Sequence, residues 1–119
     1  MARILITEDS DASRRFIRET LEIGNHEVVA EAVDGEDAVQ KFIATKPDLV
    51  LLDLAMPKKD GRQVIKEILN IDRTAKIILL SASGNLRMLN ECVDAGAVCY
   101  VMKPFAFEEL LGLIKTTLS

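Results

Sequence analysis

Four of the short apolar runs in this 119-residue sequence end in side chains that could do chemistry. Glu8 and Asp9 follow the first run, and Asp53 closes the run Asp-Leu-Val-Leu-Leu-Asp. Ser81 closes a later run, and Lys103 follows the last one. Carboxylates bind cations, whereas a hydroxyl and an ammonium bind anionic oxygens, so the chemistry depends on whether the fold brings these groups together.

If these residues converge, three carboxylates share one site. They cannot all stay charged unless a proton or a cation lies between them. The set offers oxygen ligands without His or Cys, which favours a hard cation, and Mg²⁺ is the natural candidate. Lys103 would add a fixed positive charge and Ser81 a hydroxyl donor. The set therefore predicts transfer of a phosphoryl group to a carboxylate, with the cation and the ammonium neutralising the phosphoryl oxygens.

Each residue also has an ordinary structural explanation. An Asp at a strand end is often a helix N-cap, and Glu8 and Asp9 would favour the start of a following helix. Ser81 could belong to a capping loop, and Lys103 could be a loop charge before a helix. One shared site explains all of them together better than separate coincidences at four strand ends.

The elements that would position these residues alternate between two kinds. Apolar runs of strand length are followed by segments with apolar residues at helical spacing. The expected strands are Arg3–Glu8, Glu27–Ala32, Asp48–Asp53, Lys76–Ser81 and Ala97–Met102, and the expected helices cover 11–23, 35–45, 61–71, 85–95 and 106–118. The alternation predicts an α/β fold, a flavodoxin-like (βα)5 three-layer sandwich with a parallel five-stranded sheet in the order 2-1-3-4-5. In that order the first and third strands are neighbours, so Glu8, Asp9 and Asp53 would meet.

Helical spacing also predicts which side chains face the sheet. The expected stripes are Ala12, Phe16, Thr20 and Ile23; Ala38, Phe42 and Ile43; Val64, Ile65, Ile68 and Ile71; Leu86, Leu89 and Val93; and Leu110, Leu113, Ile114 and Thr117. Asp34 is a candidate N-cap, Asp60-Gly61 precedes the third helical segment, and Gly96 ends the fourth. Apolar residues beside the last two stripes extend their apolar surface: Met88, Cys92, Ala95, Leu111 and Leu118. They indicate either a docking patch for a partner or a wider core.

Composition excludes several functions. The net charge of −4 argues against direct nucleic-acid binding, and no apolar run approaches the roughly 18 residues of a membrane span. One His and two Cys give little support to a zinc site, a Ser-His-Asp triad or a disulfide framework. These features predict a single domain over residues 1–119 in the reducing cytoplasm.

The ordered set of motifs resembles the receiver domains of response regulators, the CheY-like superfamily of two-component signalling, over the whole chain. The matching motifs are Glu8-Asp9, Asp53, Met56-Pro57, Gly61, Ser81-Ala82, Ala95-Gly96-Ala97 and Lys103-Pro104-Phe105. The resemblance implies that Asp53 is the phosphoacceptor and that Ser81 and Lys103 contact the phosphoryl group. It also implies a Mg²⁺ site made by Glu8, Asp9, Asp53 and the backbone carbonyl of Ala55.

The same resemblance implies a switch with defined partners. Ser81 would sense the phosphoryl group, and Tyr100 would be the aromatic residue that swings inward. The donor would be a phosphohistidine on a sensor histidine kinase. A downstream protein target or output domain, or a second copy in a homodimer, would bind the face made by residues 85–95, 97–102 and 106–118. The chain would catalyse only its own phosphorylation and dephosphorylation.

Four residues depart from the family pattern. Glu8 and Ser81 stand where Asp and Thr are common, and Ala55 and Ser83 leave the lifetime of the phosphorylated state open.

A receiver-like interaction module that receives no phosphate is the alternative, and Mg²⁺ affinity would distinguish it. A haloacid-dehalogenase-like phosphatase would need an acid at Ala55 and a cap for its substrate. A flavin carrier is disfavoured because the acidic residues after the first strand would repel its phosphate.

Overall fold

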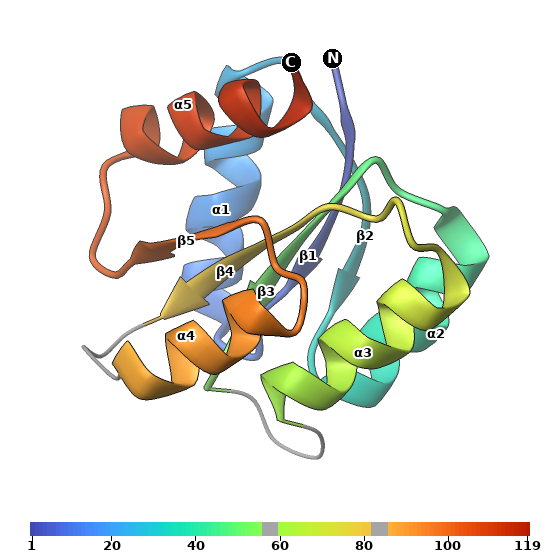
Figure 1. Cartoon of the computed structure of the whole chain (residues 1–119). Helices are drawn as coiled ribbons and strands as arrows, with labels where there is room; N and C mark the ends of the chain where they lie inside the picture. The colour runs from blue at the N-terminus through green and yellow to red at the C-terminus, as the bar shows by residue number, and fades with distance from the viewer. Residues whose placement is uncertain (56–59, 82–85) are drawn as a thin grey trace.

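The computed structural model describes residues 1–55, 60–81 and 86–119. Its parallel sheet has the order β2-β1-β3-β4-β5, which confirms the predicted fold class and strand order (Figure 1). The strands are β1 (Arg3–Thr7), β2 (Glu27–Ala32), β3 (Leu49–Asp53), β4 (Ile77–Ser81) and β5 (Cys99–Met102). The helices are α1 (Asp11–Ile23), α2 (Gly35–Thr45), α3 (Gly61–Ile71), α4 (Leu86–Asp94) and α5 (Phe107–Leu118). None of the helices within the described residues is long and apolar enough to cross a membrane.

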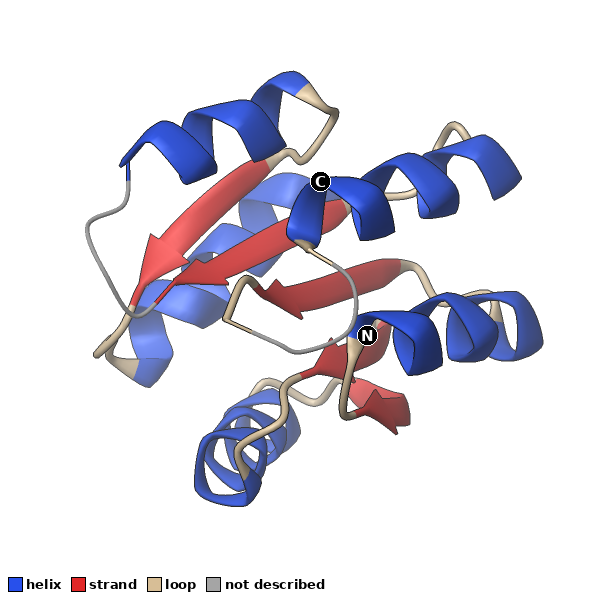
Figure 2. Cartoon of the chain, turned by 90° about the horizontal axis from the view of Figure 1, so that it is seen from below, coloured by secondary structure: helices blue, strands red, loops and turns tan. Residues whose placement is uncertain are grey.

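Helices cover both faces of the sheet and create two apolar cores (Figure 2). α1 and α5 pack on one face, and α2, α3 and α4 pack on the other. Along β3 the side chains alternate between the cores: Leu49 and Leu51 join the first, whereas Val50 and Leu52 join the second. A central strand covered on both sides must be apolar throughout, which explains why this run is continuous rather than alternating.

Capping side chains fix where three of the helices begin. Ser10 Oγ accepts a hydrogen bond from the Ser13 N–H, which starts α1. Asp34 Oδ1 accepts from the Asp37 N–H at 2.8 Å and starts α2, and Asp60 caps α3 in the same way. The capping role predicted for Asp34 is confirmed. Gly96, just past α4, has φ of +126°, a conformation that strongly favours glycine.

The predicted sheet-facing stripe of α1 is confirmed at Thr20 and wrong at its other three positions. Ile17, Thr20 and Leu21 are buried, whereas Phe16 and Ile23 are 43% and 60% exposed. Ala12 is exposed as well. One residue corresponds to about 100° around a helix, so a stripe centred on Phe16 instead of Ile17 points away from the sheet. The last residues of two other stripes, Ile43 and Ile71, are also exposed.

The predicted stripe of α4 is likewise wrong at its ends. Leu89 and Cys92 are fully buried, whereas Leu86 and Val93 are exposed. Cys92 is therefore a sheet-facing residue and cannot form part of a docking patch. Met88 and Ala95 are partly buried against the same core, and Leu118 packs against the core under α5. Of the two interpretations of these residues, the wider core is the one that the packing supports.

Candidate functional site

The site lies at the carboxyl ends of the central strands, as the strand order predicts. β1 and β3 pair in parallel with Thr7 opposite Leu52, so the next residues along, Glu8 and Asp53, are neighbours. Both are buried, with 1% and 3% of their surface exposed, whereas Asp9 is exposed. One carboxylate oxygen from each of the three residues lies within 4.8 Å of the other two. The predicted cluster of carboxylates therefore forms.

Lys103 brings a positive charge into this cluster. Its Nζ donates to Glu8 Oε1 and lies 3.4 Å from Asp53 Oδ2, so it bridges the two buried carboxylates. Its backbone N–H donates to the carbonyl of Ser81 at 2.7 Å, and its peptide bond with Pro104 is cis. Ser81, the last residue of β4, is 5% exposed at the same edge of the sheet.

The burial of these charges changes their protonation. Burial, reinforced by the hydrogen bond to Asp53, raises the pKa of Glu8 from 4.5 to about 7. Lys103 and the N–H of Ser10 act in the opposite direction. Burial on its own would lower the pKa of Lys103, but the hydrogen bond to Glu8 and the charge of Asp53 outweigh it and raise that pKa. Near neutral pH the site therefore contains a charged lysine beside a glutamate that is close to half protonated.

The donor atoms fit Mg²⁺. This ion binds oxygen ligands at about 2.0–2.1 Å, so two ligands on opposite sides of it are about 4.2 Å apart. The carboxylate oxygens of Glu8, Asp9 and Asp53 lie within 4.8 Å of one another, which is close to that requirement. Glu8 and Asp53 are also the carboxylates that Lys103 now neutralises. A cation held by this cluster would share or take over that neutralisation.

The remaining predicted residues within the described part of the chain are Ala55 and Tyr100. The N–H of Ala55 donates to Asp53 Oδ1 at 3.1 Å, which orients the carboxylate. Tyr100 lies outside the cluster, on β5 opposite Leu79, and is 40% exposed. The predicted family motifs at Met56-Pro57 and Ala82, and Ser83 beside them, lie outside the described residues.

Comparison with known proteins gives this arrangement a family. The protein-family model for the response regulator receiver domain matches residues 4–115 of this sequence. The chain belongs to that family. It is 42% identical to the chemotaxis protein CheY of Bacillus subtilis (strain 168) over 98% of both chains. It is 41% identical to CheY of Thermotoga maritima, over 87% of this chain and 86% of that protein.

A similar solved structure is the CheX–CheY–BeF3–Mg²⁺ complex from Borrelia burgdorferi. It has a TM-score of 0.93 and 28% identity, covering 98% of this chain and 89% of that one. Receiver domains are signalling modules of two-component systems. They bind Mg²⁺ at an acidic pocket and interact with histidine kinases and downstream targets. This receiver domain has an acidic cluster made by Glu8, Asp9 and Asp53.

Two features of this receiver domain were not predicted from the sequence. The first is Arg14, whose Nη1 donates to the backbone carbonyl of Glu8 at 2.9 Å. Its sequence position shows only a spacing of three residues from Asp11, which suits a surface ion pair on a helix. The contact with Glu8 depends on the path of the loop after β1, and sequence spacing does not reveal that path.

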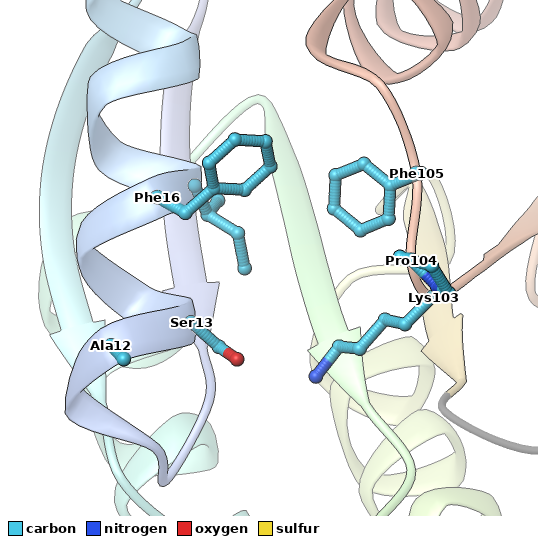
Figure 3. A pocket seen from close by; sticks show the side chains of 7 residues that line it. Ala12, Ser13, Phe16, Lys103, Pro104 and Phe105 are labelled. Carbon is cyan, nitrogen blue, oxygen red and sulfur yellow. The ribbon is translucent and has the colours of Figure 1, made fainter.

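The second feature is a cavity of about 660 Å³ beside Lys103 (Figure 3). Phe16 of α1 faces Phe105 across it, with the ring centroids 5.7 Å apart and the planes tilted by 54°. Ser13 and Lys103 lie at the other end. Phe16 is turned away from the core, and its ring packs instead against Phe105 in the segment after β5.

Proposed function

We propose that this receiver domain, formed by residues 1–119, is a phosphorylation-activated signalling switch. Asp53 accepts a phosphoryl group from a phosphohistidine of a sensor histidine kinase in a Mg²⁺-dependent reaction. The observation that carries the proposal is the convergence of the Glu8, Asp9 and Asp53 carboxylates on one point beside the Lys103 ammonium. The domain catalyses its own phosphorylation and dephosphorylation and acts on no other substrate.

The proposed chemistry follows from the charges in the site. A carboxylate oxygen of Asp53 attacks the phosphorus, and the bond from phosphorus to the donor nitrogen breaks with its electrons passing to the imidazole. Glu8, Asp9, Asp53 and the carbonyl of Ala55 would hold Mg²⁺, which would supply positive charge to the phosphoryl oxygens. Lys103 and the Ser81 hydroxyl bind those oxygens from the protein side. The cavity lined by the two phenylalanines gives a donor protein apolar surface next to the reaction.

A change at Ser81 would reach a partner through α4, β5 and α5. Ser81 ends β4, directly before the segment that leads into α4, and it pairs in register with Met102 of β5. Exposed apolar residues on these elements are Leu86, Val93, Tyr100 and Phe107, and Val98 is exposed directly before β5. They replace the partly buried Met88 and the buried Cys92 as the apolar part of the proposed surface for a target, an output domain or a second copy. Inward movement of Tyr100 would reshape this surface and shift its preference for partners.

Intact mass after incubation with acetyl phosphate tests the proposal. Wild-type protein should gain one phosphoryl group in the presence of Mg²⁺ and none in EDTA. Asp53→Asn should gain none, whereas Asp94→Asn, a matched change at an exposed carboxylate on α4, should behave as wild type. A short-lived adduct would escape this assay, so beryllofluoride is added in parallel, with Tyr100 fluorescence and Mg²⁺ affinity as readouts. If neither readout moves and no adduct forms, the domain is a constitutive interaction module.

A further inference from the structure

The geometry points to Arg14 as a positioning residue for the acidic site. We infer that its guanidinium orients the peptide between Glu8 and Asp9 so that both carboxylates face the cation. This inference rests on the proposed function, because it assumes that the acidic cluster binds Mg²⁺.

Arg14 is held by three partners at once. Nη1 donates to the Glu8 carbonyl at 2.9 Å, Nε donates to Glu31 Oε1 at 3.0 Å, and Nη2 donates to Asp11 Oδ1. The Arg14 side chain is 17% exposed, and its bonds to the Glu8 carbonyl and to Glu31 are partly buried, whereas Asp11 is 94% exposed. A guanidinium is planar and presents its donors in a fixed fork, so three fixed partners define both its position and its orientation.

The anchor of Arg14 does not depend on the acidic loop. Glu31 belongs to β2 and also accepts from Arg18 Nη1, at 3.1 Å with Oε1 and 3.0 Å with Oε2. The residue after Glu31, Ala32, accepts the Glu8 N–H at 3.0 Å. Glu8 is therefore held by β2 on both sides of its Cα, directly at its N–H and through Arg14 at its carbonyl.

This carbonyl is well placed to control two ligands. The Glu8 carbonyl and the Asp9 N–H belong to one planar peptide group. Fixing the orientation of that plane fixes where the Cα–Cβ bonds of both residues start. Groups outside the ligand shell that hold ligands in this way typically contribute 10–100-fold to metal affinity.

A purely electrostatic role for Arg14 makes the opposite prediction. A positive charge near three carboxylates repels Mg²⁺, so its removal would strengthen cation binding. A positioning role predicts that removal weakens it. The sign of the change therefore separates the two roles.

Arg15 offers the matched control, because it lies on the same helix, is 73% exposed and pairs with Glu19 at 3.8 Å.

The experiment measures Mg²⁺ dissociation constants by calorimetry in the full chain, together with the thermal midpoint of each variant. Arg14→Ala should weaken Mg²⁺ binding about tenfold or more, whereas Arg15→Ala should leave it unchanged or slightly stronger. Arg14→Lys should be nearly as weak as Arg14→Ala, because the charge remains but one ammonium cannot satisfy three separated partners. Glu31→Gln should weaken binding less, and the double variant with Arg14→Ala should be no weaker than Arg14→Ala alone.

The outcomes distinguish this inference from the proposed function. If wild-type protein binds no Mg²⁺, the proposed function fails. If wild type binds Mg²⁺ and Arg14→Ala binds it equally well or more tightly, the positioning role is wrong. If Arg14→Ala does not fold, Arg14→Lys and Glu31→Gln decide: wild-type affinity in both overturns the inference, and weakened affinity in both at an unchanged thermal midpoint supports it.

Discussion

Magnesium binding by this receiver domain should strengthen about tenfold between pH 6 and pH 8. The reason is Glu8, which must lose a proton before its carboxylate can act as a ligand. Its pKa is raised to about 7, first by burial and then by its hydrogen bond with the neighbouring Asp53. The other charged groups beside it are Asp9 and Lys103. The raised pKa of Glu8 lies between pH 6 and pH 8, so its protonation changes over this range.

The size of the effect follows from this pKa. Protonation of Glu8 multiplies the apparent dissociation constant by one plus the ratio of protonated to deprotonated glutamate. For a pKa of about 7, this factor is about 11 at pH 6, about 2 at pH 7 and about 1.1 at pH 8. The same linkage requires each Mg²⁺ bound at pH 7 to release about half a proton.

Titration calorimetry measures both quantities when it is run in two buffers with different protonation enthalpies. Glu8→Gln should bind Mg²⁺ weakly and show no slope with pH over this range. Asp9→Asn is the matched control: it removes an exposed ligand, so it should weaken binding but keep the tenfold slope. Equal wild-type affinity at pH 6 and pH 8, with no proton release, would refute the argument that burial keeps a proton on Glu8.

Three further predictions concern stability and are tested by urea unfolding without metal. First, the folded state binds the Glu8 proton more tightly than the unfolded state, so the free energy of unfolding should fall as the pH rises from about 4.5 through 7. Between pH 5 and pH 8 wild type should lose roughly 2–3 kcal/mol relative to Glu8→Gln. Second, Gly96→Ala should destabilise the fold by about 1–3 kcal/mol, because φ is +126° and the new Cβ would lie 2.3 Å from the Leu69 side chain. Gly112 lies in open space on α5, so Gly112→Ala should stabilise the fold by about 0.5–1 kcal/mol. Leu89→Ala should cost about 2–5 kcal/mol and the exposed Leu86→Ala no more than about 0.5 kcal/mol; equal costs would contradict the packing of α4.

The boundaries of most elements could be predicted because local chemistry sets them. Helices α1, α2 and α3 begin and end where the spacing predicts, and the capping by Asp34 and Asp60 is local to a few residues. β2 also matches its prediction, whereas β1 and β3 are one residue shorter at one end. Strand order followed from the alternation of elements, because a parallel sheet with right-handed crossovers leaves few arrangements.

The orientation of the helices was harder to predict. On α1 and α4 more than one stripe is apolar, so hydrophobicity alone did not decide between Phe16 and Ile17 or between Val93 and Cys92. Packing decides: the side chain nearer the sheet is buried, and the other finds a different partner or remains exposed. Phe16, for example, packs on Phe105, which is far away in the sequence.

In the site, too, the residue types could be predicted from the sequence, but the pairing between them could not. The sequence indicates that three carboxylates share one edge of the sheet and that something must neutralise them. In the structure two devices do so together: Lys103 bridges Glu8 and Asp53, and the raised pKa of Glu8 leaves it partly protonated. Both devices can be reversed by a cation, which would favour loss of the proton and weaken the hold of the carboxylates on the lysine. The ammonium would then be free to bind phosphoryl oxygens, so the group that stabilises the metal-free site is the one that the proposed reaction needs next.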